Sequence, residues 1–410
     1  MENFLKKAKE ATKIVSTLKP SFKTKVLLEF ANAIRQNQSF INGANAYDLR
    51  RATDNNLPAP LIERLKLNHG KIDAMAKAIE EIAHLREPVG KVLDGWVVPN
   101  GVRIEKVSIP IGVVSIIYES RPNVTSDTAA LCFKSGNVCV LKGGSEAQKS
   151  NAAIASVLQD ILDRFKLPRE IISILPDYSR EGVAKLVKMD KYVDVIVPRG
   201  GEGLIKYICE NSTIPVIKHD KGVCHVYIDE FADIQKAIDI AINSKCSNPS
   251  ACNALETLLV NEQIASKILP LLHEKFRDLG TKLKGCEKTR EFIRIEPASS
   301  EDFGREFLDN ILAIKVVKNL DEAISHIAKY GSSHSDAIVT ENYTNAENFL
   351  NSVDSACVYV NAATRFTDGG EFGFGAEVGI STNKLHARGP MGINELTTYK
   401  YKIYGQGQTR

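Results

Sequence analysis

Four short apolar runs that alternate with helical patterns constrain the fold more than any other feature of the sequence. Each run contains little polar alternation and is followed by a helix-like segment. The runs lie at 113–117, 138–141, 171–174 and 193–197, and the helical segments at 125–135, 147–165, 181–188 and 204–209. Strands of this kind are buried on both faces, as in a parallel sheet covered by helices. The sequence therefore predicts an α/β fold with a Rossmann-type parallel sheet in this part of the chain.

A second α/β pattern follows the first. Strand-like segments at 226–228, 255–260, 337–339 and 358–360 accompany amphipathic helical segments at 233–242 and 321–330. Residues 1 to about 90 read as helices, with apolar positions spaced i, i+3, i+4 and i+7. A chain of 410 residues suggests two or three domains.

Residues 96–107 predict a β-hairpin that interrupts the passage from helices to sheet. Asn100-Gly101 stands in its turn, between two strand-like arms. The last segment, 396–404, is strand-like as well, and an exposed edge of this kind needs a partner. We expect the tail of one subunit to pair with a sheet of another, in a homodimer at least. The alternative is a solvated hairpin with a frayed tail.

Composition argues against several functional classes. A net charge of +3 offers no basic stripe for nucleic acid, and no run approaches the roughly 18 apolar residues of a membrane span. Eight cysteines occur without a Cys-x-x-Cys pair, which points to the reducing cytoplasm. No two cysteines or histidines share a close ligand spacing, so we expect no metal site.

Cys252 is the candidate nucleophile. It ends a small, polar run that begins at Ser247, and the apolar strand 255–260 follows it closely. A cysteine placed where a loop feeds a sheet is well sited for catalysis. Asn253 follows at once and could donate a backbone or amide N–H to an oxyanion. The alternative is a small apolar cysteine in a strand leader.

Glycine-containing turns follow two of the strands in the first α/β pattern. Lys142-Gly143-Gly144-Ser145 comes after one strand, and Arg199-Gly200-Gly201 comes after another and opens a helix. Exposed N–H groups at such a place attract phosphate. The third spaced glycine of the dinucleotide fingerprint is missing, so two tight turns remain the alternative. The glycine-rich stretch 364–375 also reads as a binding loop.

Several long motifs resemble those of gamma-glutamyl phosphate reductases, which belong to the aldehyde dehydrogenase superfamily. The resemblance covers essentially the whole chain in order. The segment with the cysteine resembles the family's catalytic-cysteine motif. The matching segments are 118–125, 213–217, 250–260, 364–373 and 385–390.

The resemblance implies an aldehyde-dehydrogenase-like architecture in three parts. These are an NADP-binding domain at 1–224, interrupted by an oligomerisation hairpin at 93–109, a catalytic domain at 225–385, and a C-terminal oligomerisation segment at 386–410. It also implies reduction of L-glutamyl 5-phosphate to L-glutamate 5-semialdehyde by NADPH, a step of proline biosynthesis. A homodimer or homotetramer is expected, and whether a glutamate 5-kinase hands over the substrate stays open.

The resemblance also implies a mechanism through a cysteine thioester. Oxidising relatives place a glutamate roughly 30 residues before the cysteine to activate water. Here His219 lies 33 positions before Cys252, and 217–222 contain no glutamate. A reductase should not activate water against its own thioester, so this absence agrees with the reductive direction. His219 is either a proton-transfer partner or a hydrogen-bonded pocket residue.

The remaining site residues are assigned by the same resemblance. Lys142 would reach the adenosine ribose. Ser145 replaces the glutamate of NAD-specific relatives and so favours NADP, although Glu146 stands next to it. Arg199, Gly200 and Gly201, with Gly143 and Gly144, would face the cofactor's phosphates, and Glu306 the nicotinamide ribose.

Three residues are the substrate candidates. Arg365 is expected at the α-carboxylate and Arg121 at the phosphate, with Asn123 in the same motif as Arg121. Structural ion pairs are the alternative for both arginines. A CoA-acylating or simple aldehyde dehydrogenase, or a catalytically silent scaffold, are the competing functions.

Overall fold

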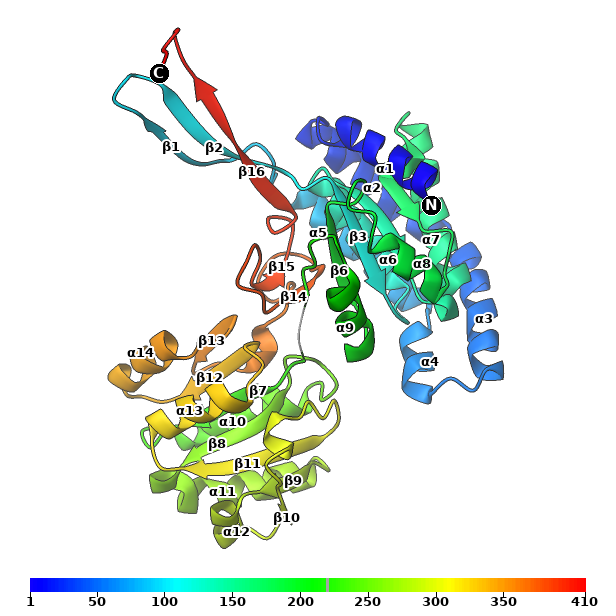
Figure 1. Ribbon diagram of the computed structural model, residues 1–410. Helices are drawn as coiled ribbons and strands as arrows, with labels where there is room; N and C mark the ends of the chain where they lie inside the picture. Colours follow the sequence, from blue (N-terminus) through cyan, green and yellow to red (C-terminus); the bar gives the residue numbers. More distant parts are fainter. Residues whose placement is uncertain (219–220) are drawn as a thin grey trace. The chain divides into compact units, whose positions relative to one another are not determined.

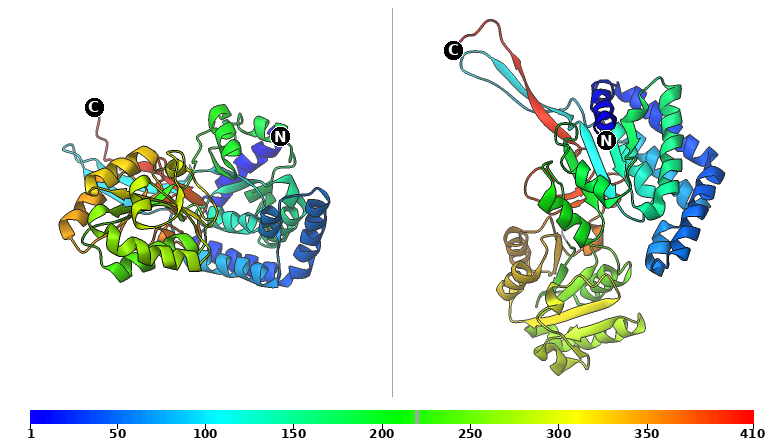
Figure 2. Two further views of the ribbon diagram at one scale, coloured as in Figure 1. Left: turned by 90° about the horizontal axis from the view of Figure 1, so that it is seen from below. Right: turned by 45° about the vertical axis from the view of Figure 1, so that its right-hand side comes forward.

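The computed structural model describes residues 1–218 and 221–410, and the chain divides into two compact units. The first unit comprises Met1–Lys218, Gly373–Gly379 and Pro390–Arg410. The second comprises His219–Phe372 and Ile380–Gly389. The sequence predicts that the first domain ends at 224 and the second at 385. In the structure the first unit ends at Lys218 and also includes Gly373–Gly379 and Pro390–Arg410. Figures 1 and 2 trace the elements of each unit along the chain.

Five helices open the first unit. They are α1 (Glu2–Val15), α2 (Pro20–Gln36), α3 (Gln38–Asp54), α4 (Ala59–Leu65) and α5 (His69–His84). Pro20 occupies the first position of α2, where its missing N–H has no helical partner to lose. The side chain of Asn68 caps α5 by accepting from the Lys71 N–H. The apolar faces predicted on α2 and α5 are buried.

The predicted parallel sheet of the first unit is present. Its order is β5-β4-β3-β6, with all neighbours parallel. Every residue of the central strand β3 is buried, as expected for a sheet covered on both faces. The strands are β3 (Val113–Tyr118), β4 (Val138–Lys142), β5 (Ile172–Ile174) and β6 (Val195–Arg199), and the helices are α6 (Asn123–Lys134), α7 (Gln148–Arg164), α8 (Arg180–Leu186) and α9 (Glu202–Asn211), with short η1 (Ser145–Ala147) and η2 (Arg169–Ile171).

The topology of this sheet marks one place for a ligand. Strand β4, the next along the chain, pairs with one edge of β3, and β6 pairs with the other edge. The winding direction of the sheet therefore changes between β3 and β6. Open α/β sheets bind ligands outside the carboxyl ends of the strands at such a point. The turns after Tyr118 and Arg199 therefore flank the predicted binding position.

The hairpin and the tail form one three-stranded arm. Strand β1 (Val92–Val97) pairs with β2 (Arg103–Pro110), and Gly101 in the turn has φ +87°. Strand β16 (Thr397–Tyr404) pairs antiparallel with β2 along eight residues. The tail thus pairs with the hairpin of its own chain, which corrects the expectation that it pairs first with another subunit.

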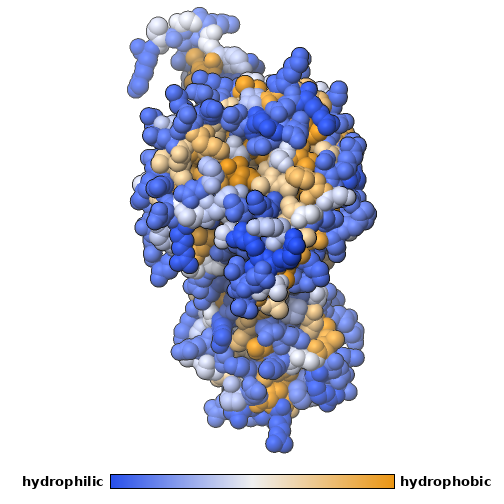
Figure 3. Space-filling model, turned by 90° about the vertical axis from the view of Figure 1, so that its right-hand side faces the viewer, coloured by the Kyte–Doolittle hydropathy of each residue, from blue (hydrophilic) through white to orange (hydrophobic). Residues whose placement is uncertain are grey.

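The arm exposes apolar side chains on its strands. All six residues of β1 are exposed, among them Trp96, and β16 exposes Tyr401 and Ile403. Figures 1 and 2 show the arm extending away from the helices of its unit. In the space-filling view of Figure 3, hydrophilic residues cover most of the visible face, with apolar patches between them. Exposed apolar strand surface of this kind is typical of an interaction site.

The second unit is built on a parallel sheet of order β10-β9-β11-β8-β7-β12-β13. Apolar residues of β7, β8 and β11 pack with α10 and α11 into one core cluster. The strands are β7 (Cys224–Ile228), β8 (Leu255–Asn261), β9 (Lys282–Gly285), β10 (Glu296–Pro297), β11 (Ile311–Val317), β12 (Ser335–Val339) and β13 (Cys357–Val360). The helices are α10 (Ile234–Cys246), α11 (Glu262–Asp278), α12 (Glu287–Phe292), α13 (Leu320–Tyr330) and α14 (Tyr343–Ser352), with short η3 (Asp302–Gly304) and η4 (Thr364–Phe366).

Two further strands, β14 (Gly379–Ser381) and β15 (Gly389–Met391), form a separate two-stranded sheet. In the described part of the chain, no helix has both the length and the apolar character needed to cross a bilayer.

Candidate active site

Cys252 lies at a corner between α10 and β8. Two successive backbone turns shape the corner, because Ala251 N–H donates to the Asn248 carbonyl and Ala254 N–H donates to the Ala251 carbonyl. Asn253 and Ala254 are buried, whereas Cys252 is half-buried. A fully buried strand directly after the corner fixes its position. The cysteine is therefore held on a rigid element and is still reachable.

Gly222 packs directly behind the nucleophile. A Cβ atom on Gly222 would overlap the carbonyl group and Cα of Cys252, so no larger residue fits without moving the loop. The thiol of Cys224 also donates to the Cys252 carbonyl, at 3.4 Å. Burial raises the pKa of the Cys224 thiol well above its usual value, so this thiol stays protonated. Cys224 supports the corner and does not compete as a nucleophile.

Glu306 supports the same corner from the other side of Gly222. Its carboxylate accepts the Gly222 N–H at 2.9 Å. The neighbouring Lys221 ammonium donates to the Gly304 carbonyl at 3.0 Å. The residue predicted to hold the nicotinamide ribose thus lies beside the segment that backs Cys252.

Asn253 ties the nucleophile corner to the glycine-rich loop. Its side-chain amide donates to the carbonyls of Thr367 (2.8 Å) and Arg365 (3.3 Å), and its own carbonyl accepts the Thr364 hydroxyl at 2.7 Å. Both amide hydrogens are engaged, which corrects the expectation that this amide serves an oxyanion. The backbone N–H of Asn253 is the donor that we retain.

Arg365 is brought to the nucleophile corner by these contacts. Its Nε donates to the hydroxyl of Ser247, the first residue of the corner, at 3.2 Å. The side chain is half-buried in η4. The structure therefore joins Cys252, Asn253, Glu306 and Arg365 in the second unit.

A buried ion pair connects the two elements that flank the corner. Lys245 near the end of α10 contacts Glu256 in β8 at 2.8 Å, and both side chains are fully buried. Glu256 also accepts the Leu308 N–H at 3.3 Å. Burial raises the pKa of Glu256 to about 7, against the opposing effect of Lys245. Loss of either partner would leave an uncompensated buried group beside the corner.

His219 lies outside the described residues. Among the residues that the structure describes, no group of three or more histidine, cysteine or acidic side chains is arranged to hold a metal ion.

The turn after β4 is closely packed around its two glycines. A Cβ on Gly143 would overlap the Asn151 amide, and one on Gly144 would overlap the Glu146 carboxylate. Ser145 is exposed, and burial lowers the pKa of Lys142, a half-buried residue with Glu146 and Glu119 nearby. In this turn Gly143 and Gly144 are buried and Ser145 is exposed.

Glu146 connects the turn after β4 to the turn after β3. Its Oε1 accepts both the backbone N–H (2.6 Å) and the hydroxyl (2.8 Å) of Ser120. Ser120 has φ +40°, a strained value for a residue with a side chain. This carboxylate thus holds a strained turn, and it lies close to Gly144 and Lys142.

The turn after β6 is occupied by the carboxylate of Glu119, the residue directly after β3. Gly201 N–H donates to Glu119 Oε2 at 2.9 Å, and a Cβ on Gly200 would lie 2.6 Å from the same oxygen. The Arg199 guanidinium instead donates to the Val378 carbonyl at 2.6 Å. Gly200 and Gly201 therefore form an anion-accepting turn, and Arg199 is engaged beside it.

Arg121 and Asn123 belong to the first unit, at the start of α6. Both are exposed, and the Asn123 amide donates to the Asp127 carboxylate at 3.0 Å. Arg121, the predicted phosphate contact, and the substrate candidate Asn123 thus belong to a different unit than Cys252 and Arg365.

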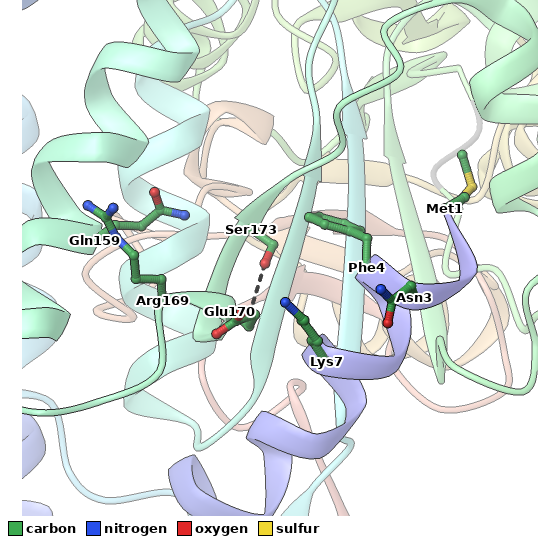
Figure 4. Close-up of a pocket in the computed structure, with 8 residues that line it drawn as sticks. All are labelled: Met1, Asn3, Phe4, Lys7, Gln159, Arg169, Glu170 and Ser173. Carbon is green, nitrogen blue, oxygen red and sulfur yellow. Dashed lines mark hydrogen bonds between the residues drawn. The ribbon is translucent and has the colours of Figure 1, made fainter.

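A groove of about 460 Å³ lies elsewhere, where the start of α1 meets η2 and β5. Figure 4 shows Lys7, Arg169 and Glu170 among its lining side chains. It contains none of the predicted site residues. Because the chemistry of the chain gathers at the strand ends, we do not assign the active site to this groove.

The sequence alone assigns no role to Gly222, Cys224 or Glu119. Gly222 lies in the segment 217–222 and Glu119 in the motif 118–125. Their roles depend on contacts with Cys252 and Gly201, which are 30 and 82 positions away in the chain. A local pattern carries no signal for such contacts.

Comparison with known proteins shows similarity over the whole chain. The model of the aldehyde dehydrogenase family matches residues 1–290. The chain is 63% identical over 410 residues to gamma-glutamyl phosphate reductase of Sulfurimonas denitrificans, and 63% identical over 411 residues to that of Nitratiruptor sp., with 100% of both sequences covered each time. The solved structure of gamma-glutamyl phosphate reductase from Thermotoga maritima matches with a TM-score of 0.97 and 45% identity, over 100% of this chain and 99% of that one.

Proposed function

From the premise that the chain belongs to the aldehyde dehydrogenase family, and within it to the gamma-glutamyl phosphate reductases, we propose that it uses NADPH to reduce L-glutamyl 5-phosphate to L-glutamate 5-semialdehyde and phosphate. The chain is an oxidoreductase of that family, and proline biosynthesis is its pathway. The cofactor, the thioester route and the residue roles below are our proposal.

The observation that carries the mechanism is the corner of Cys252. Gly222 and Cys224 pack against its main chain, Asn253 ties it to η4 by hydrogen bonds, and Cys252 itself is half-buried. The Cys252 thiolate attacks the γ-carbonyl carbon of the acyl phosphate. The carbon–sulfur bond forms, the bond to the phosphate oxygen breaks, and phosphate leaves with the electron pair. A thioester on Cys252 results.

The chain's own groups orient this step. The backbone N–H of Asn253 is placed next to the nucleophile and donates to the oxygen that gains charge. The Arg365 guanidinium, held near Ser247, binds the α-carboxylate of the glutamyl group. Arg121 and Asn123 receive the phosphate that leaves.

The first unit fits a dinucleotide on two observations. The Gly201 N–H already donates to a carboxylate, the kind of group that a phosphate would replace, and Gly143, Gly144 and Gly200 each stand where a Cβ would overlap a neighbouring side chain. Lys142 and Ser145 would hold the adenosine ribose and its 2′-phosphate, Gly200 and Gly201 the pyrophosphate, and Glu306 the nicotinamide ribose. When bound, NADPH supplies the hydride that reduces the thioester carbon.

Product release restores the nucleophile. Collapse of the reduced carbon gives the aldehyde and returns the electron pair to the Cys252 sulfur. Residues 217–222 contain no glutamate to activate water, so hydrolysis of the thioester to glutamate is disfavoured. His219 remains in the proposal as a proton-transfer or pocket residue.

We place the enzyme in the cytoplasm as a homodimer or homotetramer, in which the arm of β1, β2 and β16 contributes the contact. The support is its exposed apolar surface, including Trp96 and Ile403. Direct transfer of the substrate from a glutamate 5-kinase is compatible with this arrangement.

The test is the reverse reaction, followed at 340 nm with semialdehyde, phosphate and NADP. We expect NADPH formation that depends on phosphate, and its loss in Cys252→Ala with NADPH binding nearly unchanged. Substantial turnover by Cys252→Ala would remove the nucleophile assignment. Equal rates with CoA in place of phosphate would favour the CoA-acylating alternative.

A further inference from the structure

We propose that Glu119 is an internal competitor for the cofactor. Its carboxylate accepts a hydrogen bond from the Gly201 N–H when no dinucleotide is bound. This hydrogen bond has to break before the pyrophosphate can accept from the same N–H. Glu119 thereby lowers cofactor affinity and eases cofactor release. This inference rests on the proposed function, because it concerns the same cofactor site.

The position of Glu119 in the sheet supports this role. It is the residue directly after β3, and Gly201 follows β6, so the contact lies at the point where the winding direction of the sheet changes. The Glu119 N–H donates to the Arg199 carbonyl at 3.1 Å, which extends the pairing of the two strands by one residue. The main chain of Glu119 is thus fixed, and its side chain reaches across the place expected for the ligand.

The contact itself resembles the binding of an anion at a helix start. Gly201 is the N-cap of α9, a helix of 10 residues, and it carries no side chain that could cap the helix. The carboxylate of Glu119 supplies the missing acceptor at 2.9 Å. A phosphate that binds the Gly201 N–H has to displace the Glu119 carboxylate, which carries a charge of the same sign.

Gly200 ties the carboxylate to the turn. A Cβ on Gly200 would lie 2.6 Å from Glu119 Oε2 and 2.8 Å from the Leu204 side chain. The turn therefore has room for this carboxylate because residue 200 lacks a side chain. Glu119 is exposed, so its side chain can move into solvent when it is displaced.

The other carboxylates near this turn do not compete for the Gly201 N–H. Lys142 lies near the carboxylates of Glu119, Glu146 and Asp177. Glu146 is held by Ser120, and Asp177 accepts from the Ser179 N–H and hydroxyl. Of these three carboxylates, Glu119 is the one that sits on the N–H assigned to the cofactor. When only a fraction of the molecules have the site open, the apparent affinity falls by that fraction.

The test compares Glu119→Gln with Glu202→Gln. Glu202 lies in the first turn of the same helix and is exposed, so its variant removes one negative charge at a similar place without vacating the Gly201 N–H. NADPH binding is measured by fluorescence titration without substrate. We expect the Kd of Glu119→Gln to fall about five- to tenfold, and that of Glu202→Gln to change less than about twofold.

A second readout uses the protein without cofactor. Glu119→Gln weakens the acceptor of the α9 N-terminus, so its Tm should fall by about one to a few degrees while the Tm increase caused by NADPH becomes larger. If Glu119 had a purely structural role, Glu119→Gln would lower both the Tm without cofactor and the Tm increase caused by NADPH. Glu119→Asp, whose shorter side chain reaches the N–H less well, should give a Kd between those of the wild type and Glu119→Gln.

Failure of the proposed function and failure of the role proposed for Glu119 give different binding results. If the wild-type protein does not bind NADPH, the proposed function is wrong. If the wild type binds NADPH and Glu119→Gln binds it equally or more weakly, Glu119 is not a competitor and the inference is overturned. If Glu202→Gln tightens binding as much as Glu119→Gln, general charge accounts for the effect and the inference is likewise overturned.

Discussion

Gly222 is a single residue on which the geometry of the nucleophile depends. We expect Gly222→Ala to lower kcat by about 100-fold or more, because its Cβ would overlap the Cys252 carbonyl and shift the thiol from its reacting position. The Kd for NADPH should change far less than kcat, since the cofactor turns belong to the other unit and only Glu306, which accepts the Gly222 N–H, lies next to the substitution. Steady-state kinetics and a cofactor titration measure the two effects.

A matched control exists in α3. A Cβ on Gly43 would meet no atom within 4 Å, so Gly43→Ala should keep full activity. It should also stabilise the protein by about 0.5–1 kcal/mol through helix propensity. Wild-type kcat in Gly222→Ala would contradict the packing argument.

Ser145 is the residue that we expect to set the choice between NADP and NAD. Ser145→Glu should raise the KM for NADPH at least about tenfold, because a carboxylate next to the 2′-phosphate repels it. Ser145→Gln, which has the same size without the charge, should have a smaller effect. Comparable wild-type kcat/KM values for NADPH and NADH would refute the assignment.

The candidate site could be predicted only in part from single residues. Cys252 was identified by a small polar run ahead of a buried strand, and Gly143, Gly144, Gly200 and Gly201 by their places after strands. The engagement of the Asn253 amide was missed, because its acceptors are Arg365 and Thr367, more than 100 positions away. Contacts of that range depend on the completed fold and not on a local pattern.

At the scale of an element, α13 carries a buried histidine whose charge the fold opposes. His326 packs against Phe303 and Tyr330, and its Nδ1 lies 3.4 Å from the Lys315 ammonium. Burial lowers the pKa of His326 to about 3, and electrostatic interactions with His225, Lys315 and Lys329 lower it further. The folded protein therefore keeps this imidazole neutral at ordinary pH.

The sign of the resulting pH dependence follows directly. Below about pH 6.5 His326 is protonated in the unfolded chain but stays neutral in the folded protein. The free energy of unfolding therefore falls as the pH decreases toward 3. Between pH 6.5 and 5 the loss from this residue is about 2 kcal/mol. His326→Phe, an aromatic replacement, should remove that part of the loss, as measured by urea unfolding at both pH values.

An exposed histidine serves as the control for this measurement. His69→Gln, at the start of α5, should keep the wild-type pH dependence. An unchanged slope in His326→Phe would mean that another group causes the acid sensitivity.

The elements themselves were largely predictable. The strands of both sheets stand out as apolar runs because both of their faces are buried, as all seven residues of β8 are. The prediction of an aldehyde-dehydrogenase-like α/β fold is confirmed by the parallel sheets and by the matching structure. The partner of β16 was not predictable, because strand-like character does not say which edge a strand will join.

At the scale of the whole molecule, the arm is expected to control assembly. Deleting residues 396–410 removes β16 and should convert an oligomer into monomers or insoluble protein, because β2 loses its partner along eight residues. Deleting only 405–410, which are exposed and follow β16, should leave the oligomer intact. Light scattering distinguishes these outcomes, and a monodisperse full-length monomer at micromolar concentration would remove the hypothesis.

The pairing of β16 with β2 also has a consequence for synthesis of the chain on the ribosome. Thr397 pairs with Pro110, roughly 290 positions earlier, so at about 5–20 residues per second β2 waits on the order of 15–60 seconds for its neighbour. During that interval one edge of the hairpin has no strand from its own chain beside it, and neighbouring nascent chains on the same messenger RNA present the same edge. We therefore expect the yield of correctly folded protein to depend on translation speed and on chaperones that shield this edge until the last residues emerge.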